Sequence, residues 1–330
     1  MSLPLPSPAC GRFGASSNSG GKDPKDAEGV FVVVKDEVNL LPDDANASQG
    51  DESVNEWTHF SVTAETRRLW RITFDCPPIN LVSPEMINEL PRLVDHMETA
   101  SELRVAVFES ANPEYFLNHY DTSRVAETPK ELGASGYPLL IDASTRLSRL
   151  PVVSIAKVRG RVRGVGSELI QAMDMRFASE RALFCQPETA NGNLPGGGGL
   201  EHLPLLLGRA RALEAALSSD DYPGELAERY GWVNRTVRDG ELDMLVDVLA
   251  RRIASFDKES IAAVKQQINR YTLPSAEDLQ SSYDLYMHSF GWPGSKRRIP
   301  AALAAGRNQP GDYEMRLGYH LGHQPEEDTP

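Results

Sequence analysis

Short apolar runs alternate with longer amphipathic stretches through the middle of the chain. Residues 60–63 and 69–74 have the β-branched and aromatic composition of strands. Ser83 then stands where a helix N-cap belongs, and apolar residues recur at the 3.6-residue period from Met86 to Met97. Pro91 lies inside this stretch, so we predict either a kink there or a helix that begins after it.

The same order of strand and helix recurs twice more. Residues 105–108 and 152–156 are predicted strands, and each precedes a predicted helix. The first of these helices has an apolar stripe from Leu139 to Leu150, and the second opens near Val165. Short strands that alternate with helices predict the α/β class. Beyond residue 203 the pattern is mainly helical, with predicted helices at residues 209–217, 224–230, 241–255, 258–269 and 276–288.

The two ends of the chain differ from its middle. Residues 1–56 are dominated by Ser, Gly, Pro, Asn and Asp, so we predict a disordered polar N-terminal extension. Residues 30–34 are an apolar exception with two open interpretations, a strand that docks on the body or on a neighbouring subunit, or an aggregation-prone stretch of the tail. The predicted core that carries the site spans residues 57–220, a helical region spans 221–290, and 291–330 form an extension with a short helix at 301–305 and a polar tail.

Composition narrows the class of protein. The formal net charge of −13 argues against nucleic acid as a partner, because no basic stripe is present to neutralise phosphates. Cys10, Cys76 and Cys185 are widely spaced, which excludes a disulfide framework and indicates a reducing compartment. No apolar run reaches the roughly 18 residues of a membrane span, and the N-terminal residues do not have the pattern of a targeting segment. We therefore predict a cytoplasmic protein.

The candidate chemistry lies in two short motifs, each with one carboxylate. Gly160, Gly164 and Gly166 follow a predicted strand and precede Glu168, which lies just inside a helix. Glu188 closes a Gln-Pro-Glu block, and a run of four glycines follows at 196–199. Carboxylates beside turns that present backbone N–H groups can move protons next to a developing oxyanion. Taken alone, Glu168 is also explained as a carboxylate at a helix N-terminus and Glu188 as one on a surface loop.

Other motifs do not support a cofactor or a metal. The glycines at 160, 164 and 166 lack the spacing and the downstream acid of a dinucleotide site, and no Gly-Lys-Ser/Thr phosphate loop occurs. His320 and His323 lie in the predicted polar tail without a third ligand nearby. We expect neither a metal nor a separate cofactor.

The order of these motifs resembles the crotonase superfamily, the enoyl-CoA hydratases and isomerases. Pro78, Ile79 and Asn80 are similar to the family's Pro-x-Asn, and residues 115–121 to its Phe-Ser-Ala-Gly-Ala-Asp loop. The resemblance continues through residues 151–168, the Gln-Pro-Glu block and the glycine run, and it ends near residue 234. It implies crotonase-like stacked β-β-α units and a C-terminal helical oligomerisation region, assembled as a homotrimer or a hexamer.

The resemblance implies an acyl-CoA thioester substrate and a reaction that passes through its enolate. The positions that match the family's oxyanion donors are the backbone N–H groups of Tyr120 and Val165, the second at a helix N-terminus where the dipole favours negative charge. Glu168 matches the position that orients and activates water in hydratases, and Glu188 the position that delivers a proton. Coenzyme A is expected only as part of the substrate. The matching substrate-binding positions are Asn80, Leu81, His119, Gly164 and Gly196.

Because both glutamates are present, the predicted reaction is addition of water to a 2-enoyl-CoA or the reverse elimination. One alternative is an isomerase, which needs only the Glu188 position, or a carbon–carbon bond-cleaving member. Another is a crotonase-fold protein that binds acyl-CoA without catalysis.

The chain departs from the family pattern where His119 and Tyr120 replace small residues and Val165 replaces a glycine. Three interpretations stay open: the bulky side chains point away from the pocket, His119 adds a donor or a base near the carbonyl, or the cavity is blocked. Arg159, Arg161 and Arg163 are candidates for contacts with the phosphates of coenzyme A, and a solvated edge of loop and strand explains each of them as well.

Overall fold

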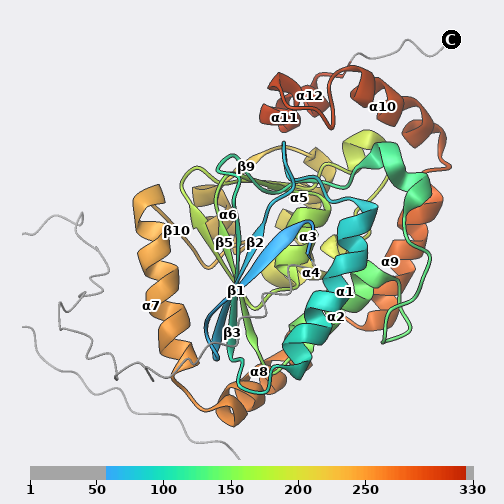
Figure 1. The fold of residues 1–330 in the computed structure, drawn as a ribbon. Helices are drawn as coiled ribbons and strands as arrows, with labels where there is room; N and C mark the ends of the chain where they lie inside the picture. The colour runs from blue at the N-terminus through green and yellow to red at the C-terminus, as the bar shows by residue number, and fades with distance from the viewer. Residues whose placement is uncertain (1–56, 325–330) are drawn as a thin grey trace, which may run out of the picture. The chain divides into compact units, whose positions relative to one another are not determined.

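The computed structural model of the protein describes residues 57–324. The predictions of disorder for residues 1–56 and of a docking strand at 30–34 lie outside the described residues. Within residues 57–324, two sheets and the helices around them form an α/β fold (Figure 1).

The larger sheet has six strands in the order β1-β2-β3-β5-β7-β10. β1 and β2 are antiparallel, and every later pair of neighbours in this sheet is parallel. The predicted strands at 60–63, 69–74, 105–108 and 152–156 are β1, β2, β3 and β5. The six strands are β1 Phe60–Thr66, β2 Leu69–Phe74, β3 Val105–Ser110, β5 Val153–Val158, β7 Met175–Ser179 and β10 Arg235–Val237.

A smaller sheet lies beside it in the order β4-β6-β8-β9, with β4 Tyr115–Leu117, β6 Arg161–Arg163, β8 Leu183–Cys185 and β9 Tyr222–Pro223. The unit β3-β4-α2 gives one strand to each sheet and then a helix, and the units β5-β6-α3 and β7-β8-α4 do the same. These are the stacked β-β-α units that the resemblance implies. Because β4 and β6 are neighbours, the residues that follow these two strands come close together.

Helices cover the sheets on both sides, and the predicted helices after residue 203 correspond to α5–α9. The first half of the described chain contains α1 Pro84–Thr99, η1 Thr122–Glu127, α2 Leu139–Arg149, α3 Val165–Gln171, η2 Thr189–Asn191, α4 Gly199–Leu207 and α5 Arg209–Ser218. The second half contains α6 Gly224–Tyr230, η3 Asp239–Glu241, α7 Leu242–Ala254, α8 Lys258–Thr272, α9 Ala276–Ser289, α10 Pro293–Ala304, α11 Asp312–Met315 and α12 Leu317–Gly322.

The start of α1 is set by its cap. The Ser83 hydroxyl accepts a hydrogen bond from Met86 N at 3.2 Å, and Pro84 occupies a first-turn position where its missing N–H leaves no bond unmade. The helix then runs through Pro91, so the alternative that it begins after this proline was wrong. The apolar stripe around Pro91 is buried, and this packing outweighs the backbone hydrogen bond that the proline removes.

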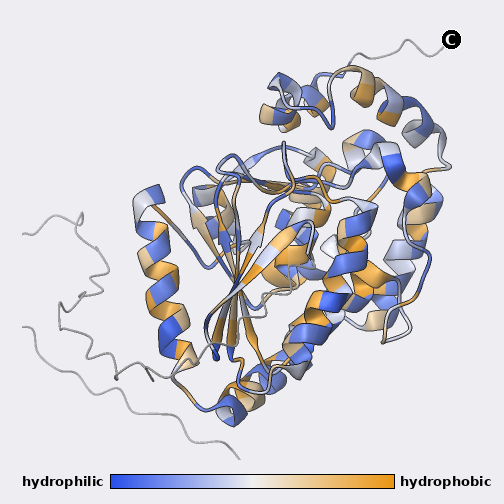
Figure 2. Cartoon of the chain, viewed as in Figure 1, coloured by the Kyte–Doolittle hydropathy of each residue, from blue (hydrophilic) through white to orange (hydrophobic). Residues whose placement is uncertain are grey.

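Strand β3, in the interior of the larger sheet, is apolar toward both faces. Val105 and Val107 of β3 pack with Leu242 and Val246 of α7, whereas Phe108 joins the core on the opposite face. Figure 1 shows α7 alone along one face of the sheet and α1 and α2 beyond the other, and Figure 2 shows the apolar residues of these helices. A strand buried on both sides explains the continuous apolar runs in the sequence.

The chain after residue 290 is more ordered than its polar composition suggested. The sequence predicted one short helix at 301–305, whereas the structure has α10, α11 and α12, which lie together at one end of the fold (Figure 1). Tyr313, Leu317 and Leu321 bury their side chains with Ala302 and contact Ala190. Glycine and asparagine turns separate these apolar residues, so no helical period was visible.

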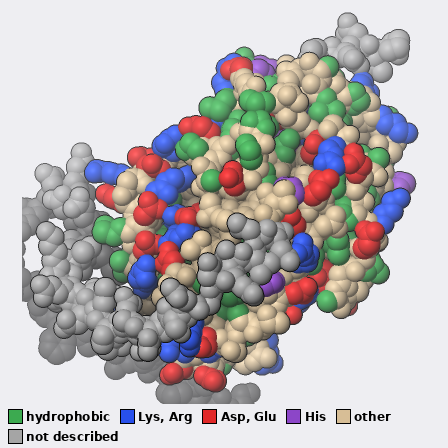
Figure 3. Space-filling model, in the orientation of Figure 1, with side chains coloured by type: hydrophobic (Ala, Val, Ile, Leu, Met, Phe, Trp, Pro, Cys, Tyr) green, Lys and Arg blue, Asp and Glu red, His purple; other side chains and the backbone are tan. Residues whose placement is uncertain are grey.

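The described surface carries mixed charges. Figure 3 shows acidic and basic side chains intermixed over the visible face. None of the helices in residues 57–324 combines the length and the apolar character that crossing a membrane requires.

Candidate active site

A small buried cavity of about 30 Å³ lies between the start of α3, the loop after β4, the glycine run and α9. This volume holds one or two water molecules. Glu168 and Glu188 both line it, together with Tyr120, Val165 and Gly196. The structure therefore brings both predicted carboxylates and both predicted oxyanion positions to one place.

Glu168 is held by the glycine run. It lies in the first turn of α3, and its Oε1 atom accepts hydrogen bonds from Gly197 N and Gly199 N, each at 2.9 Å. A Cβ atom added at Gly197 or Gly199 would lie 2.9 Å from a Glu168 carboxylate oxygen, so a larger residue at either position would displace this carboxylate. Burial raises the pKa of Glu168 to about 7, although the two N–H donors act in the opposite direction.

Glu188 lies just after β8, beside the turn that begins α3. Its Oε2 atom accepts a hydrogen bond of 3.3 Å from Gln186 Nε2, and a Cβ atom added at Gly164 would lie 2.7 Å from its Oε1. Burial and the negative charge of Glu168 raise the pKa of Glu188 to about 8, and the charge of Arg307 partly opposes this. Two carboxyl groups with raised pKa values in one cavity can divide the roles of acid and base.

The two predicted oxyanion donors come from neighbouring strands. Tyr120 follows β4, and Val165 follows β6 as the first residue of α3. A Cβ atom added at Gly166 would overlap the backbone of Leu117, so the start of α3 directly abuts the end of β4. Among the hydrogen bonds of residues 57–324, neither Tyr120 N–H nor Val165 N–H has an acceptor. Both donors remain available to a ligand atom.

The remaining predicted substrate contacts lie in different places. Gly196 is at the cavity wall, and Gly164 lies behind it with φ +49° beside Glu188 and His119. Leu81 is half-buried and is not among the cavity residues. The Asn80 side chain is fully buried and bonds to Cys76 N, Ser110 Oγ and the carbonyl oxygens of residues 115 and 116, so it fixes the loop around β4 instead of reaching the cavity.

The three side chains that depart from the family pattern lie in different places relative to the cavity. Tyr120 and Val165 line the cavity and reduce its volume, so they do not point away from it. The Tyr120 hydroxyl bonds to Thr128 Oγ1 at 2.8 Å. His119 is buried away from the cavity, with Nδ1 3.0 Å from Tyr120 O and Nε2 2.8 Å from Glu314 Oε1. Both ring nitrogens are engaged by these two partners, and His119 is not among the residues that line the cavity.

The three candidate phosphate contacts are all engaged within the chain. Arg159 pairs with Asp239 and Asp243, and Arg161 pairs with Glu114. Arg163 is fully buried and forms two 2.8 Å hydrogen bonds to the carboxylate of Asp221. Burial excludes Arg163 from contact with a phosphate in solution.

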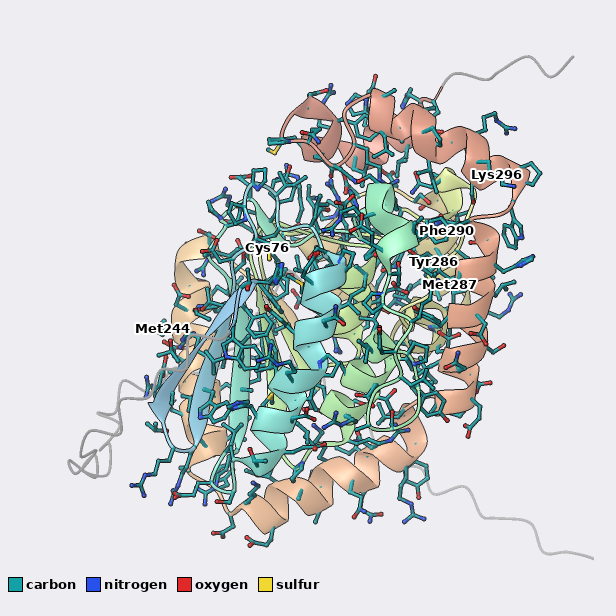
Figure 4. All side chains as sticks on the ribbon, turned by 45° about the vertical axis from the view of Figure 1, so that its right-hand side comes forward. Cys76, Met244, Tyr286, Met287, Phe290 and Lys296 are labelled. Carbon is teal, nitrogen blue, oxygen red and sulfur yellow. The ribbon has the colours of Figure 1, made fainter. Side chains whose placement is uncertain are left out.

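Helix α9 supplies cavity residues that the sequence did not reveal. Tyr283 and Tyr286 line the cavity, and Tyr286 packs on Gly196, where an added Cβ atom would overlap its side chain. Burial and the negative charges of Glu188 and Glu168 raise the pKa of Tyr286 well above its usual range. Figure 4 shows Tyr286 and Phe290 near one another on α9, with ring centroids 4.9 Å apart. The two tyrosines close the cavity on this side.

Two charged residues from the C-terminal segment also reach the site region. Glu314 of α11 is fully buried against His119, and Arg307 is buried near Glu188, with Nε and Nη1 lacking a hydrogen-bond partner in the described part of the chain. Charged residues in a polar stretch carry no sign of burial, so the sequence did not single them out.

Comparison with known proteins shows the family of this chain. The model of the enoyl-CoA hydratase/isomerase family matches residues 65–296, which is more than half of the chain. The chain belongs to the enoyl-CoA hydratase/isomerase family. The family and the fold predicted from the motifs are thereby confirmed.

Three known proteins indicate how similar this family member is to others. The short-chain-enoyl-CoA hydratase of Clostridium acetobutylicum is 29% identical over 192 residues, which cover 58% of this chain and 74% of that protein. The carnitinyl-CoA dehydratase of Escherichia coli O157:H7 is 29% identical over 235 residues, which cover 70% of this chain and 85% of that protein. A solved structure from Streptomyces avermitilis, named a putative enoyl-CoA hydratase, is 38% identical with a TM-score of 0.77 and covers 82% of this chain and 98% of that chain.

The family match of this enoyl-CoA hydratase/isomerase member stops before its C-terminal segment. Residue 296 lies near the start of α10, whereas Arg307 and Glu314 come later. The residues that the C-terminal segment brings to the site region therefore lie outside the residues that the family model matches.

Proposed function

We propose that the protein adds water across the double bond of a 2-enoyl-CoA thioester, or removes water in the reverse direction. The observation that carries this proposal is that one cavity is lined by both carboxylates and both oxyanion positions, Glu168, Glu188, Tyr120 and Val165. The thioester oxygen would accept hydrogen bonds from the backbone N–H groups of Tyr120 and Val165. These bonds would stabilise the enolate as negative charge develops on the oxygen. Coenzyme A enters as part of the substrate, and the proposal needs no separate cofactor.

The two carboxyl groups would divide the proton transfers. Burial raises the pKa of both glutamates, but only Glu168 accepts two backbone N–H hydrogen bonds, which favour its ionised form. The proton that the pair retains is therefore assigned to Glu188. Ionised Glu168 would orient and activate the water that attacks C3, and protonated Glu188 would deliver the proton to C2. This order agrees with the roles that the resemblance implies.

A surface hollow gives the substrate a way to the cavity. The hollow has a volume of about 530 Å³, and Thr128 and Tyr283 line both it and the cavity. Apolar residues from η1, from the loop after it and from α9, including Val125 and Met287, form its walls. Because the cavity itself holds only about 30 Å³, Tyr283 or Tyr286 must move when an acyl group enters.

The proposal is tested by the loss of the conjugated thioester absorbance when the full-length protein meets crotonyl-CoA, longer 2-enoyl-CoAs and aryl analogues. We expect turnover with at least one of these substrates and formation of the 3-hydroxyacyl product. Reaction of 3-enoyl or β-diketone thioesters in preference to 2-enoyl ones would instead select the isomerase or the carbon–carbon bond-cleaving alternative.

The small cavity supports a second candidate function, binding of an acyl-CoA without catalysis. Tyr120, Val165, Tyr283 and Tyr286 occupy the space that a substrate would need beside the carboxylates. Calorimetry with a saturated acyl-CoA distinguishes this candidate, because tight binding in the absence of turnover with every substrate would select it.

We further propose that the protein assembles as a homotrimer or a hexamer. A groove of about 690 Å³ runs between α4 and α8, and the apolar side chains of Leu205, Val264 and Ile268 on its walls are more than half exposed, at 53%, 61% and 56%. An exposed apolar patch of this kind favours burial against another copy of the chain.

Ile268→Asp is expected to dissociate the assembly, because a carboxylate cannot be buried at an apolar contact. Light scattering of the full-length protein and of the variant measures this. Met244→Asp is the matched control, since Met244 is also exposed and lies on α7, away from α9 in Figure 4. A monomeric wild type would contradict the proposed assembly, and so would an unchanged mass for Ile268→Asp.

A further inference from the structure

Glu314 of α11 is a buried carboxylate with an unusually complete set of donors. Its Oε1 atom accepts from His119 Nε2 at 2.8 Å and from Asn308 N at 2.9 Å, and its Oε2 atom accepts from Asn118 Nδ2 at 3.1 Å. Burial alone would raise the pKa of Glu314, but the charge of His119 and these hydrogen bonds hold it well below its usual range. Glu314 is therefore an ionised acceptor in the interior of the protein.

Two of the three donors to Glu314 belong to the first oxyanion loop, by which we mean residues 118–121 after β4. Asn118 and His119 are the two residues that precede Tyr120, whose N–H is one of the proposed oxyanion donors. On the other side of Tyr120, Asp121 Oδ1 accepts a 2.6 Å hydrogen bond from Asn308 Nδ2. The C-terminal segment thus holds this loop on both sides of the donor.

The backbone of Glu314 and Met315 is bound to the second oxyanion loop, by which we mean β6 and the turn that leads from it to Val165. The carbonyl oxygen of Glu314 accepts a hydrogen bond of 2.5 Å from Arg163 Nη1, and Met315 O accepts one of 3.0 Å from Arg161 Nε. Arg161 and Arg163 begin and end β6, which leads through Gly164 to Val165, the other proposed donor. One residue of α11 consequently contacts the chain just before each of the two N–H groups.

We propose that Glu314 is a positioning residue that fixes the separation of the Tyr120 and Val165 N–H groups by binding both loops at once. The proposal rests on the proposed oxyanion function of these two groups. Its basis is that the Glu314 carboxylate binds the residues after β4, while the carbonyl oxygen of the same residue binds the end of β6. Because a misplacement of about 1 Å can cost two orders of magnitude in rate, such a connection bears on catalysis as well as on folding.

The test is Glu314→Gln in the full-length protein. Glutamine retains one acceptor oxygen for His119 and Asn308, but its amide nitrogen cannot accept from Asn118, and the negative charge is lost. We expect kcat for the 2-enoyl-CoA substrate to fall roughly 10-fold to 100-fold while KM changes less than about threefold, because the oxyanion contacts strengthen in the transition state.

The matched control is Leu321→Ala. Leu321 is buried in the packing of the same C-terminal segment with Tyr313 and Ala302, so its truncation loosens the segment without removing a hydrogen bond to either loop. We expect this variant to unfold at a lower temperature with kcat close to that of the wild type. The proposal would be overturned if Glu314→Gln and Leu321→Ala lowered kcat equally. It would also be overturned if both variants changed only the unfolding temperature.

A second readout separates this proposal from the proposed reaction. Acetoacetyl-CoA forms an enolate that absorbs in the ultraviolet, and a well-aligned oxyanion site raises the enolate fraction of the bound ligand. We expect the wild type to raise this fraction at a fixed pH and Glu314→Gln to raise it less at the same saturation. An enolate signal without hydration of any 2-enoyl-CoA would reject the proposed reaction and still support the role of Glu314. An equal signal from both proteins, or no binding by the wild type, would reject the role of Glu314.

Discussion

Glu188→Gln is expected to lower kcat for hydration of a 2-enoyl-CoA by a factor on the order of 10²–10⁴, because glutamine cannot deliver a proton to C2. KM should change little, since Glu188 acts on the reacting carbon and not on the coenzyme A part of the substrate. Glu168→Gln should cause a loss in the same range, because its water is no longer activated. Steady-state measurement of thioester absorbance gives both constants.

The stability of the two glutamine variants is the control for this loss. Burial raises the pKa of Glu168 to about 7 and that of Glu188 to about 8, above the ordinary value of 4.5. The native protein then binds more protons than the unfolded chain between these values, so the free energy of unfolding falls as the pH rises from about 4.5 to about 8. Glutamine has no such proton to lose. Each variant should therefore be about as stable as the wild type near about pH 5 and more stable than it above about pH 8.

Urea unfolding at the two pH values measures that difference. A Glu188→Gln protein that is folded and fully active would remove Glu188 from the mechanism. A variant less stable than the wild type at the higher pH would show instead that the carboxylate is ionised and bound in the native state.

The second large effect is expected for Gly166→Ala. In the first turn of a helix this change usually stabilises, by up to about 1 kcal/mol. Here the added Cβ atom would overlap the Leu117 backbone and lie 2.8 Å from Asn118 O, so α3 and the end of β4 must separate. Because the two oxyanion donors lie on these segments, kcat should fall by a factor on the order of 10²–10³. The free energy of unfolding should also fall, by about 1–3 kcal/mol.

Gly240→Ala is the matched control for Gly166→Ala. Gly240 is exposed, and an added Cβ atom would meet no atom within 4 Å. Its kcat and unfolding midpoint should stay close to those of the wild type. If Gly166→Ala behaves like Gly240→Ala, the close approach of α3 to β4 does not set the oxyanion geometry.

Much of the fold could be predicted from the sequence because apolar residues follow the strand pattern or the helical period within each element. β3 is apolar at every position that contacts the two cores, and apolar residues recur at each turn of α2. The local sequence therefore indicates which faces of these elements are buried. Glu168 and Glu188 could be predicted for a related reason. Glu168 lies in the first turn of α3 after the glycine turn that follows β6, and Glu188 closes the Gln-Pro-Glu block that follows β8.

The residues that complete the site from the other side could not be predicted in this way. Tyr286 and Phe290 are four residues apart on α9, a spacing that any amphipathic helix can show. Glu314 looks like a solvated charge in a polar stretch, and its partner His119 is 195 residues earlier in the chain. A buried ion pair between such distant positions leaves no local pattern, so only the folded structure reveals it.

The distance along the chain between His119 and Glu314 has a consequence for biosynthesis. During translation the segments near the N-terminus can fold first, so the segments that carry both glutamates and both proposed oxyanion positions are made before Glu314. The ribosome must add 195 further residues after His119 before Glu314 exists. The nascent protein therefore passes through a stage in which the proposed catalytic groups are present and Glu314 does not yet connect the two loops, so we expect the proposed activity only after Glu314 has been added.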